Sequence, residues 1–66
     1  MDVMVNGTEE RMEASATVAD VVVRFCHSPD GIAVARNGEV VPRSAWARTA
    51  LGAGDRLEIV TAAAGG

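Results

Sequence analysis

Two Asn-Gly dipeptides, at residues 6–7 and 37–38, constrain the fold of this 66-residue chain more than any other feature. Each lies between short runs in which apolar and polar residues alternate, the pattern of a β-strand with one buried face. Asparagine and glycine both tolerate the positive φ angles of a two-residue turn, so Asn-Gly between such runs predicts a tight hairpin. We therefore predict two β-hairpins, over residues 2–14 and 32–42.

An amphipathic helix is predicted between the two hairpins. Four apolar residues recur at the spacing of one helix face: Val18, Val21, Val22 and Phe25. Thr17 directly precedes this stretch and is a favourable N-cap, and Asp20 lies three residues later, which makes an imperfect capping box. We expect the helix to run from about Val18 to Cys26 and to end before the sequence SPDG.

A last strand is predicted over residues 56–60, RLEIV, after the turn sequence GAGD. Two hairpins, a helix between them and a final strand indicate an α+β fold. We expect a mixed sheet of four to five strands with one helix packed across one face, and with the first and last strands parallel at its centre. The other face of such a sheet meets water or a partner.

Alternation assigns side chains to the two faces of this sheet. If Val3, Val5, Leu57 and Ile59 face the helix, four apolar residues face the other way: Met4, Val60, Ala33 and Ala35. A shallow apolar patch of this kind is a candidate partner-binding face. The alternative is equally open at this point, because isolated exposed apolar side chains are ordinary on soluble proteins.

Composition excludes several classes of function. The net charge is −3, which argues against nucleic acid as a partner, since phosphates favour a basic surface. No apolar run approaches the length of a membrane span, and no secretory signal is evident, so a cytoplasmic location is expected. A single cysteine, Cys26, and a single histidine, His27, predict no disulfide, metal site or catalytic pair. We expect no bound cofactor.

The chain closes with the sequence TAAAGG, which buries almost no apolar surface. We assign residues 1–60 to one domain and residues 61–66 to a flexible C-terminal tail. Six extended residues reach roughly 20 Å. Gly65 and Gly66 have no side chain to obstruct a narrow cleft, and Ala64 is only slightly larger. These residues indicate a terminus that is threaded into another protein rather than one that simply frays.

Three stretches together resemble a known family: RNGEVVPRSAW at 36–46, GDRLEIV at 54–60, and the closing Gly65-Gly66. They are similar to the sulfur carrier proteins of thiamine biosynthesis, which are small ubiquitin-like proteins of the β-grasp fold. The likeness covers nearly the whole chain. The Gly-Gly end is shared with other families, whereas the block around Trp46 favours the thiamine branch.

The resemblance implies a carrier rather than an enzyme. In this family an adenylating enzyme uses ATP and magnesium to activate the C-terminal carboxylate, here that of Gly66. A cysteine desulfurase indirectly supplies the sulfur that converts it to a thiocarboxylate, and thiazole synthase accepts that sulfur. The alternatives are the small subunit of molybdopterin synthase, another thiocarboxylate carrier, and a ubiquitin-like modifier joined to lysines of other proteins.

Overall fold

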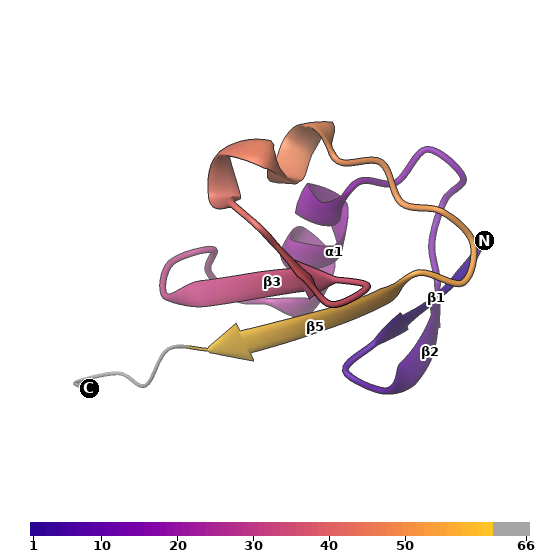
Figure 1. Cartoon of the computed structure of the whole chain (residues 1–66), viewed down its shortest axis with the longest axis horizontal. Helices are drawn as coiled ribbons and strands as arrows, with labels where there is room; N and C mark the ends of the chain where they lie inside the picture. The colour runs from indigo at the N-terminus through magenta and orange to yellow at the C-terminus, as the bar shows by residue number, and fades with distance from the viewer. Residues whose placement is uncertain (62–66) are drawn as a thin grey trace.

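The computed structural model describes residues 1–61, which form a five-stranded sheet with one α-helix across one face (Figure 1). The strands are β1 Asp2–Val5, β2 Thr8–Arg11, β3 Ile32–Arg36, β4 Glu39–Val41 and β5 Arg56–Thr61. The helices are α1 Val18–Phe25 and a 3-10 segment, η1 Arg43–Arg48. The predicted α+β class and β-grasp arrangement are confirmed.

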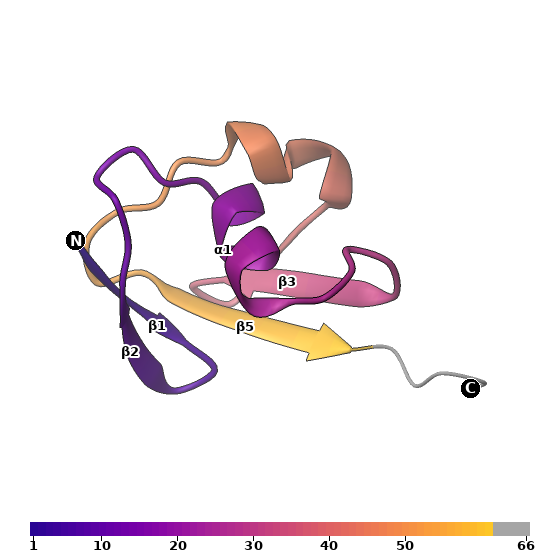
Figure 2. The ribbon, with the colours of Figure 1, turned by 180° about the vertical axis from the view of Figure 1, so that it is seen from behind.

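The strands are ordered β2-β1-β5-β3-β4, so β5 lies at the centre of the sheet. It runs parallel to β1 and antiparallel to β3, and the two hairpins flank it on either side. Figure 2 shows β1 and β5 side by side beneath α1 from behind. The parallel pairing of the first and last strands, expected from the sequence, is confirmed.

Both Asn-Gly dipeptides form the predicted hairpin turns. Asn6 and Asn37 each have a φ of 50°, and the glycines that follow them, Gly7 and Gly38, have φ angles of 82° and 86°. Positive φ at both central positions is the geometry whose twist matches that of the flanking strands. A residue with a branched side chain is strained in this region of φ, so the turns favour asparagine and glycine at these positions.

The core lies between α1 and the sheet. Five side chains are almost completely buried: Val3, Val18, Val21, Val34 and Leu57. They come from one face of the sheet and one face of the helix, as the alternating and helical patterns predict. At the start of α1, the Asp20 carboxylate accepts hydrogen bonds from the Thr17 backbone N–H at 2.8 Å and from its hydroxyl at 3.2 Å.

Trp46 closes one end of this core. Trp46 is only 5% exposed to solvent, and its indole N–H donates to the carbonyl oxygen of Val41 at 2.9 Å. The guanidinium of Arg43 lies over the ring at 6.0 Å from its centroid. Trp46 therefore belongs to the core of the domain.

The structure corrects several boundaries. Strand β2 ends at Arg11 rather than Ala14, and α1 ends at Phe25, so Cys26 is its C-cap. Phe25 was expected on the buried helix face but is 37% exposed, because it lies on the last turn and stacks under the Arg24 guanidinium, 5.1 Å from the ring centroid. Residue Thr61 belongs to β5, although the sequence assigned it to the tail.

Candidate functional site

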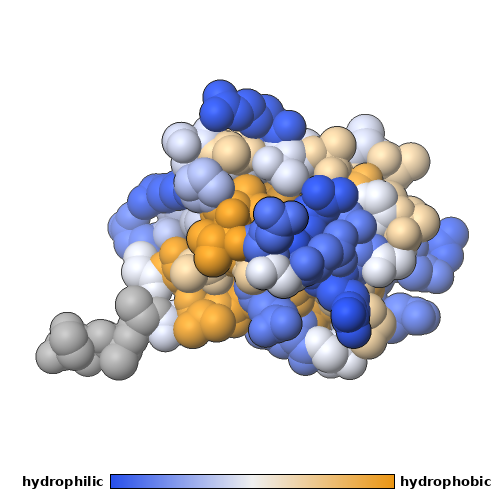
Figure 3. Space-filling model, in the orientation of Figure 1, coloured by the Kyte–Doolittle hydropathy of each residue, from blue (hydrophilic) through white to orange (hydrophobic). Residues whose placement is uncertain are grey.

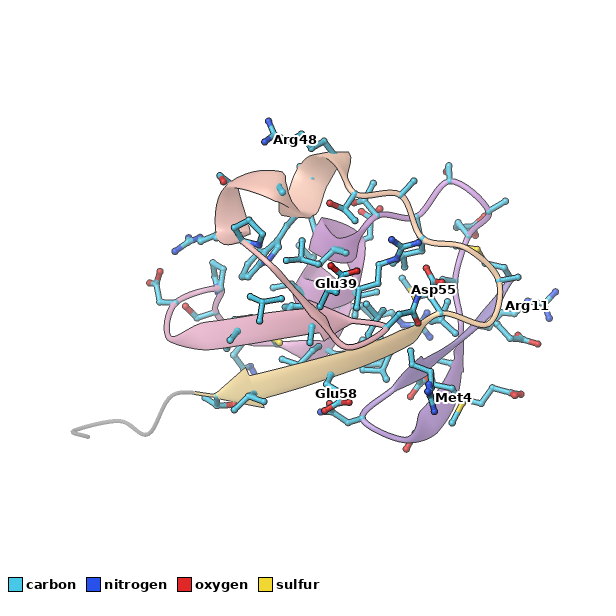
Figure 4. The ribbon with its side chains drawn as sticks, viewed as in Figure 1. Met4, Arg11, Glu39, Arg48, Asp55 and Glu58 are labelled. Atoms are coloured by element: carbon cyan, nitrogen blue, oxygen red, sulfur yellow. The ribbon has the colours of Figure 1, made fainter. Side chains whose placement is uncertain are left out.

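The face of the sheet away from α1 is the candidate partner-binding surface. Figure 4 shows Met4 and Glu58 extending from the sheet on this side, opposite the helix. The strand registers explain why, because residues directly opposite one another in neighbouring strands share a face. Met4 pairs with Arg56, Ala35 with Glu58, and Ala33 with Val60. We refer to this surface as the open face.

All four residues predicted to point away from the helix lie on the open face. Val60 is 61% exposed and Ala33 is exposed, whereas Met4 and Ala35 are half-buried. Val40, which pairs with Ala35, adds a further valine with 74% exposure. In Figure 3 apolar surface is visible around the end of β5, next to the point where the described chain stops. Alternation along the strands thus predicts the face of these four side chains, whereas the position of Val40 follows from its pairing with Ala35.

The apolar and charged parts of the open face are separated along β5. Arg56 and Glu58 lie toward its start, and Val60 lies toward its end. The apolar part is therefore the part nearest the tail. The predicted tail residues Ala64, Gly65 and Gly66 lie outside the described residues, but Thr61, the last described residue, is paired with Ile32 at the end of the sheet.

Asp55, which no sequence motif singles out, organises the beginning of β5. Its carboxylate accepts hydrogen bonds from the Gly52 backbone N–H at 2.7 Å, from Arg36 Nε at 2.7 Å and from Asn37 Nδ2 at 3.1 Å. Asp55 is 8% exposed. Burial raises the pKa of this carboxyl, but the hydrogen bond from Gly52, those from Arg36 and Asn37, and the positive charge of Arg36 outweigh burial. The pKa of Asp55 is therefore lowered.

Two of these partners, Arg36 and Asn37, lie 19 and 18 residues away in sequence, so no local pattern could reveal their bonds to Asp55. The only available signal was an aspartate placed directly between a turn glycine and a strand. Asn37 contributes to the same arrangement, because its side-chain oxygen accepts the Arg56 backbone N–H at 2.9 Å. Asp55 thus fixes the start of the central strand rather than forming a reactive site.

Cys26 and His27 line a shallow pocket together with Phe25, Ile32 and Thr61, beside the end of β5. Cys26 is half-buried and packs against the core. Within residues 1–61, no group of three or more histidine, cysteine, aspartate or glutamate side chains has the arrangement of a metal site. In the same range, no helix is both long enough and apolar enough to cross a membrane.

Comparison with known proteins assigns the family. The model of the ThiS family matches residues 3–66, which is nearly the entire chain. The chain belongs to the ThiS family. Members of this family are small sulfur carriers of thiamine biosynthesis, so the resemblance seen in the sequence is confirmed.

A solved structure and a curated relative agree with this assignment. The crystal structure of the thiamine biosynthesis protein ThiS from Geobacter metallireducens is similar over the full length of both chains, with a TM-score of 0.85 and 28% identity. A thiazole synthase from Paramagnetospirillum magneticum is 39% identical over all 66 residues. The chain spans about a fifth of the length of that relative, since the match covers 20% of it.

Proposed function

We propose that this protein carries sulfur on the carboxyl group of Gly66 and delivers it for formation of the thiazole part of thiamine. Its membership of the ThiS family carries this proposal. The protein acts as a co-substrate of other enzymes and contributes no catalytic residue of its own. It functions in the cytoplasm.

The chemistry of a carboxyl terminus suits this role. An α-carboxyl has a pKa of about 3.3–3.7, so it is ionised at neutral pH and is a poor electrophile. A carboxylate oxygen of Gly66 attacks the α-phosphorus of ATP on an activating enzyme that holds magnesium, and pyrophosphate leaves. Sulfur at the oxidation level of sulfide, derived indirectly from a cysteine desulfurase, then attacks the acyl carbon of the adenylate and displaces AMP, and a thiocarboxylate results.

The thiocarboxylate is the form that reacts with thiazole synthase. Its sulfur is a soft nucleophile that remains covalently attached to the carrier until it is transferred. The similarity to a protein named thiazole synthase supports this partner, because a segment of that protein matches the whole of this chain. After transfer and hydrolysis the carboxylate is available for another cycle.

Threading of the tail explains the small residues at its end. An adenylating site shields its acyl intermediate from water, so the terminus has to enter a narrow opening. Gly65 and Ala64 present little or no side chain to that opening. The activating enzyme binds the domain through the open face. On this face Val60 and Ala33 lie next to the start of the tail, and Ala35 and Met4 lie further from it.

Intact mass spectrometry tests the proposal. Incubation with ATP, magnesium, an activating enzyme and a sulfur donor should exchange one oxygen of the carrier for sulfur. Addition of thiazole synthase and its substrates should restore the original mass. Covalent attachment of the carrier to lysines of other proteins, without any thiocarboxylate, would instead identify a protein modifier.

A further inference from the structure

Asn6 bonds to the central strand in a way that its role in a turn does not explain. The β1–β5 ladder ends at the pair Val5–Leu57, and the Asn6 backbone N–H then donates to the Leu57 carbonyl at 2.9 Å. Because Asn6 has a φ of 50°, the backbone of the first hairpin turns back at this point. β5 continues for four residues beyond Leu57.

The side chain of Asn6 continues the pairing where the backbone of β1 stops. Its Oδ1 accepts the Ile59 backbone N–H at 2.8 Å, and its Nδ2 donates to the Ile59 carbonyl at 3.3 Å. In a parallel ladder the same N–H and C=O would be paired with two further residues of the neighbouring strand. One amide thus supplies both the donor and the acceptor that β1 no longer provides.

The contact between Asn6 and Ile59 lies close to the start of the tail. One edge of β5 remains paired with β3 through Thr61, and on the opposite edge, which faces β1, Asn6 bonds to Ile59. Ile59 lies two residues before Thr61, from which the chain continues to Gly66. The amide of Asn6 therefore fixes the strand just before the tail begins.

We propose that Asn6 is a positioning residue for the carrier: its side-chain amide, acting through Ile59, sets the direction in which the chain leaves the sheet toward Gly66. This rests on the proposed function, because the direction matters only if Gly66 has to reach a reactive site in another protein. A carboxylate that departs from a fixed base samples fewer orientations, so it reaches the attacking geometry more often once the domain has docked.

The second hairpin provides a matched control. Asn37 occupies the same position in its Asn-Gly turn and has the same φ of 50°. Its amide also bonds to β5, but at the start of the strand, to the Arg56 N–H and to Asp55 Oδ1. Glycine accepts positive φ, so Asn6→Gly and Asn37→Gly both keep the turn conformation. Asn6→Gly removes the side-chain amide that bonds Ile59 near the end of β5, and Asn37→Gly removes the one that bonds Arg56 at its start.

Hydrogen exchange on the isolated protein tests the contact independently of any enzyme. In Asn6→Gly, exchange of the Ile59 amide relative to the core amide of Val34 should accelerate roughly three- to tenfold, the loss expected for one hydrogen bond. Asn6→Asp should fall between this variant and the wild type, because its carboxylate accepts a hydrogen bond but cannot donate one. Asn37→Gly should instead accelerate exchange of the Arg56 amide. Unchanged exchange of Ile59 in Asn6→Gly would overturn the proposal.

Kinetics of ATP–pyrophosphate exchange with an activating enzyme test the positioning role. For Asn6→Gly we expect kcat to fall roughly tenfold or more while KM stays close to the wild-type value, because misplacement of a reacting group affects the chemical step. Asn37→Gly should retain wild-type kcat at a temperature where all variants are folded. Equal kcat for Asn6→Gly and the wild type would refute positioning.

The failure of the proposed function has a different signature. A wild-type protein that supports no exchange with the activating enzyme would contradict the carrier proposal itself. In that case the order parameters of the Val60 and Thr61 amides decide on the local role of Asn6. They should decrease in Asn6→Gly and not in Asn37→Gly, and identical values would count against it.

Discussion

At the scale of single residues, the Asp55 carboxylate holds the beginning of β5 through three hydrogen bonds, one of them charge-assisted by Arg36. Its position could not be predicted from the sequence, because its partners Arg36 and Asn37 come from the distant second hairpin. By contrast, both Asn-Gly turns were predictable, since the dipeptide itself accepts the required φ. The bonds of Asn6 and Asn37 to β5 were not, because they depend on the assembled sheet.

Replacement of Asp55 should destabilise the fold. In Asp55→Asn the ion pair with Arg36 is lost, and the new amide presents a donor toward groups that already donate. Hydrogen bonds to charged groups contribute about 1.5–3 kcal/mol each, so we expect a loss of about 2 kcal/mol in the free energy of unfolding measured with urea. Asp2→Asn is the control: its ion pair with Arg11 is solvent-exposed and should contribute less than about 1 kcal/mol.

The lowered pKa of Asp55 also predicts a dependence of stability on pH. The folded pKa lies below the unfolded value of about 3.9, so the contribution of Asp55 is fully present above that value. It is lost as the pH falls through the folded pKa. Urea unfolding of the wild type between neutral and acid pH should show this loss, and Asp55→Asn should show a shallower decline. If the free energy of unfolding falls equally with pH in the wild type and in Asp55→Asn, the proposed contribution of Asp55 is contradicted.

Cys26 should be dispensable for the chemistry. It is half-buried at the end of α1 and packs against the core, so Cys26→Ser should lower stability modestly by placing a hydroxyl in a partly apolar site. The variant should still gain one sulfur by intact mass, because the proposed acceptor is the Gly66 carboxyl. A folded variant that cannot acquire sulfur would show that the thiol takes part.

At the scale of elements, the periodicities of the sequence identified the strands and α1 correctly and their ends less well. Alternation in residues 8–14 suggested a longer β2, but pairing with the four residues of β1 limits that strand to Thr8–Arg11. The segment RSAWAR, which has neither the strand nor the helix periodicity, forms the 3-10 helix η1. Strand boundaries depend on the partner strand, which local patterns do not specify.

The open face gives a prediction about recognition. Val60→Asp should weaken binding to the activating enzyme by about tenfold or more, because docking would bury an unpaired charge. Met4→Asp should act in the same direction. Val23→Asp is a matched control, since Val23 is a valine with 80% exposure on α1, on the other side of the sheet. Isothermal titration calorimetry measures the three affinities; equal losses for Val60→Asp and Val23→Asp would exclude the open face as the contact.

At the scale of the whole molecule, the fold and the proposed chemistry occupy different parts of the chain. The buried core extends from Val3 to Leu57, and the strand that ends it continues to Thr61. The proposed reactive group, the carboxyl of Gly66, lies five residues further on. The fold class followed from hairpin, helix and strand signals, whereas the function depended on family likeness. No spacing of residues within the domain indicates sulfur transfer.

This separation predicts that deletion of Gly66 leaves the domain intact and removes its activity. The circular dichroism spectrum and the urea midpoint should match those of the wild type, because no core residue is affected. ATP–pyrophosphate exchange with the activating enzyme should disappear, since the new terminal carboxylate of Gly65 falls short of the reactive position by up to about 3.5 Å. Displacements far smaller than this already impair an in-line attack. Restoring the length with Gly66→Ala should recover part of the exchange, because alanine returns the carboxylate to its place and adds only one methyl group. Full exchange by the shortened chain would show that a group other than the Gly66 carboxylate is activated.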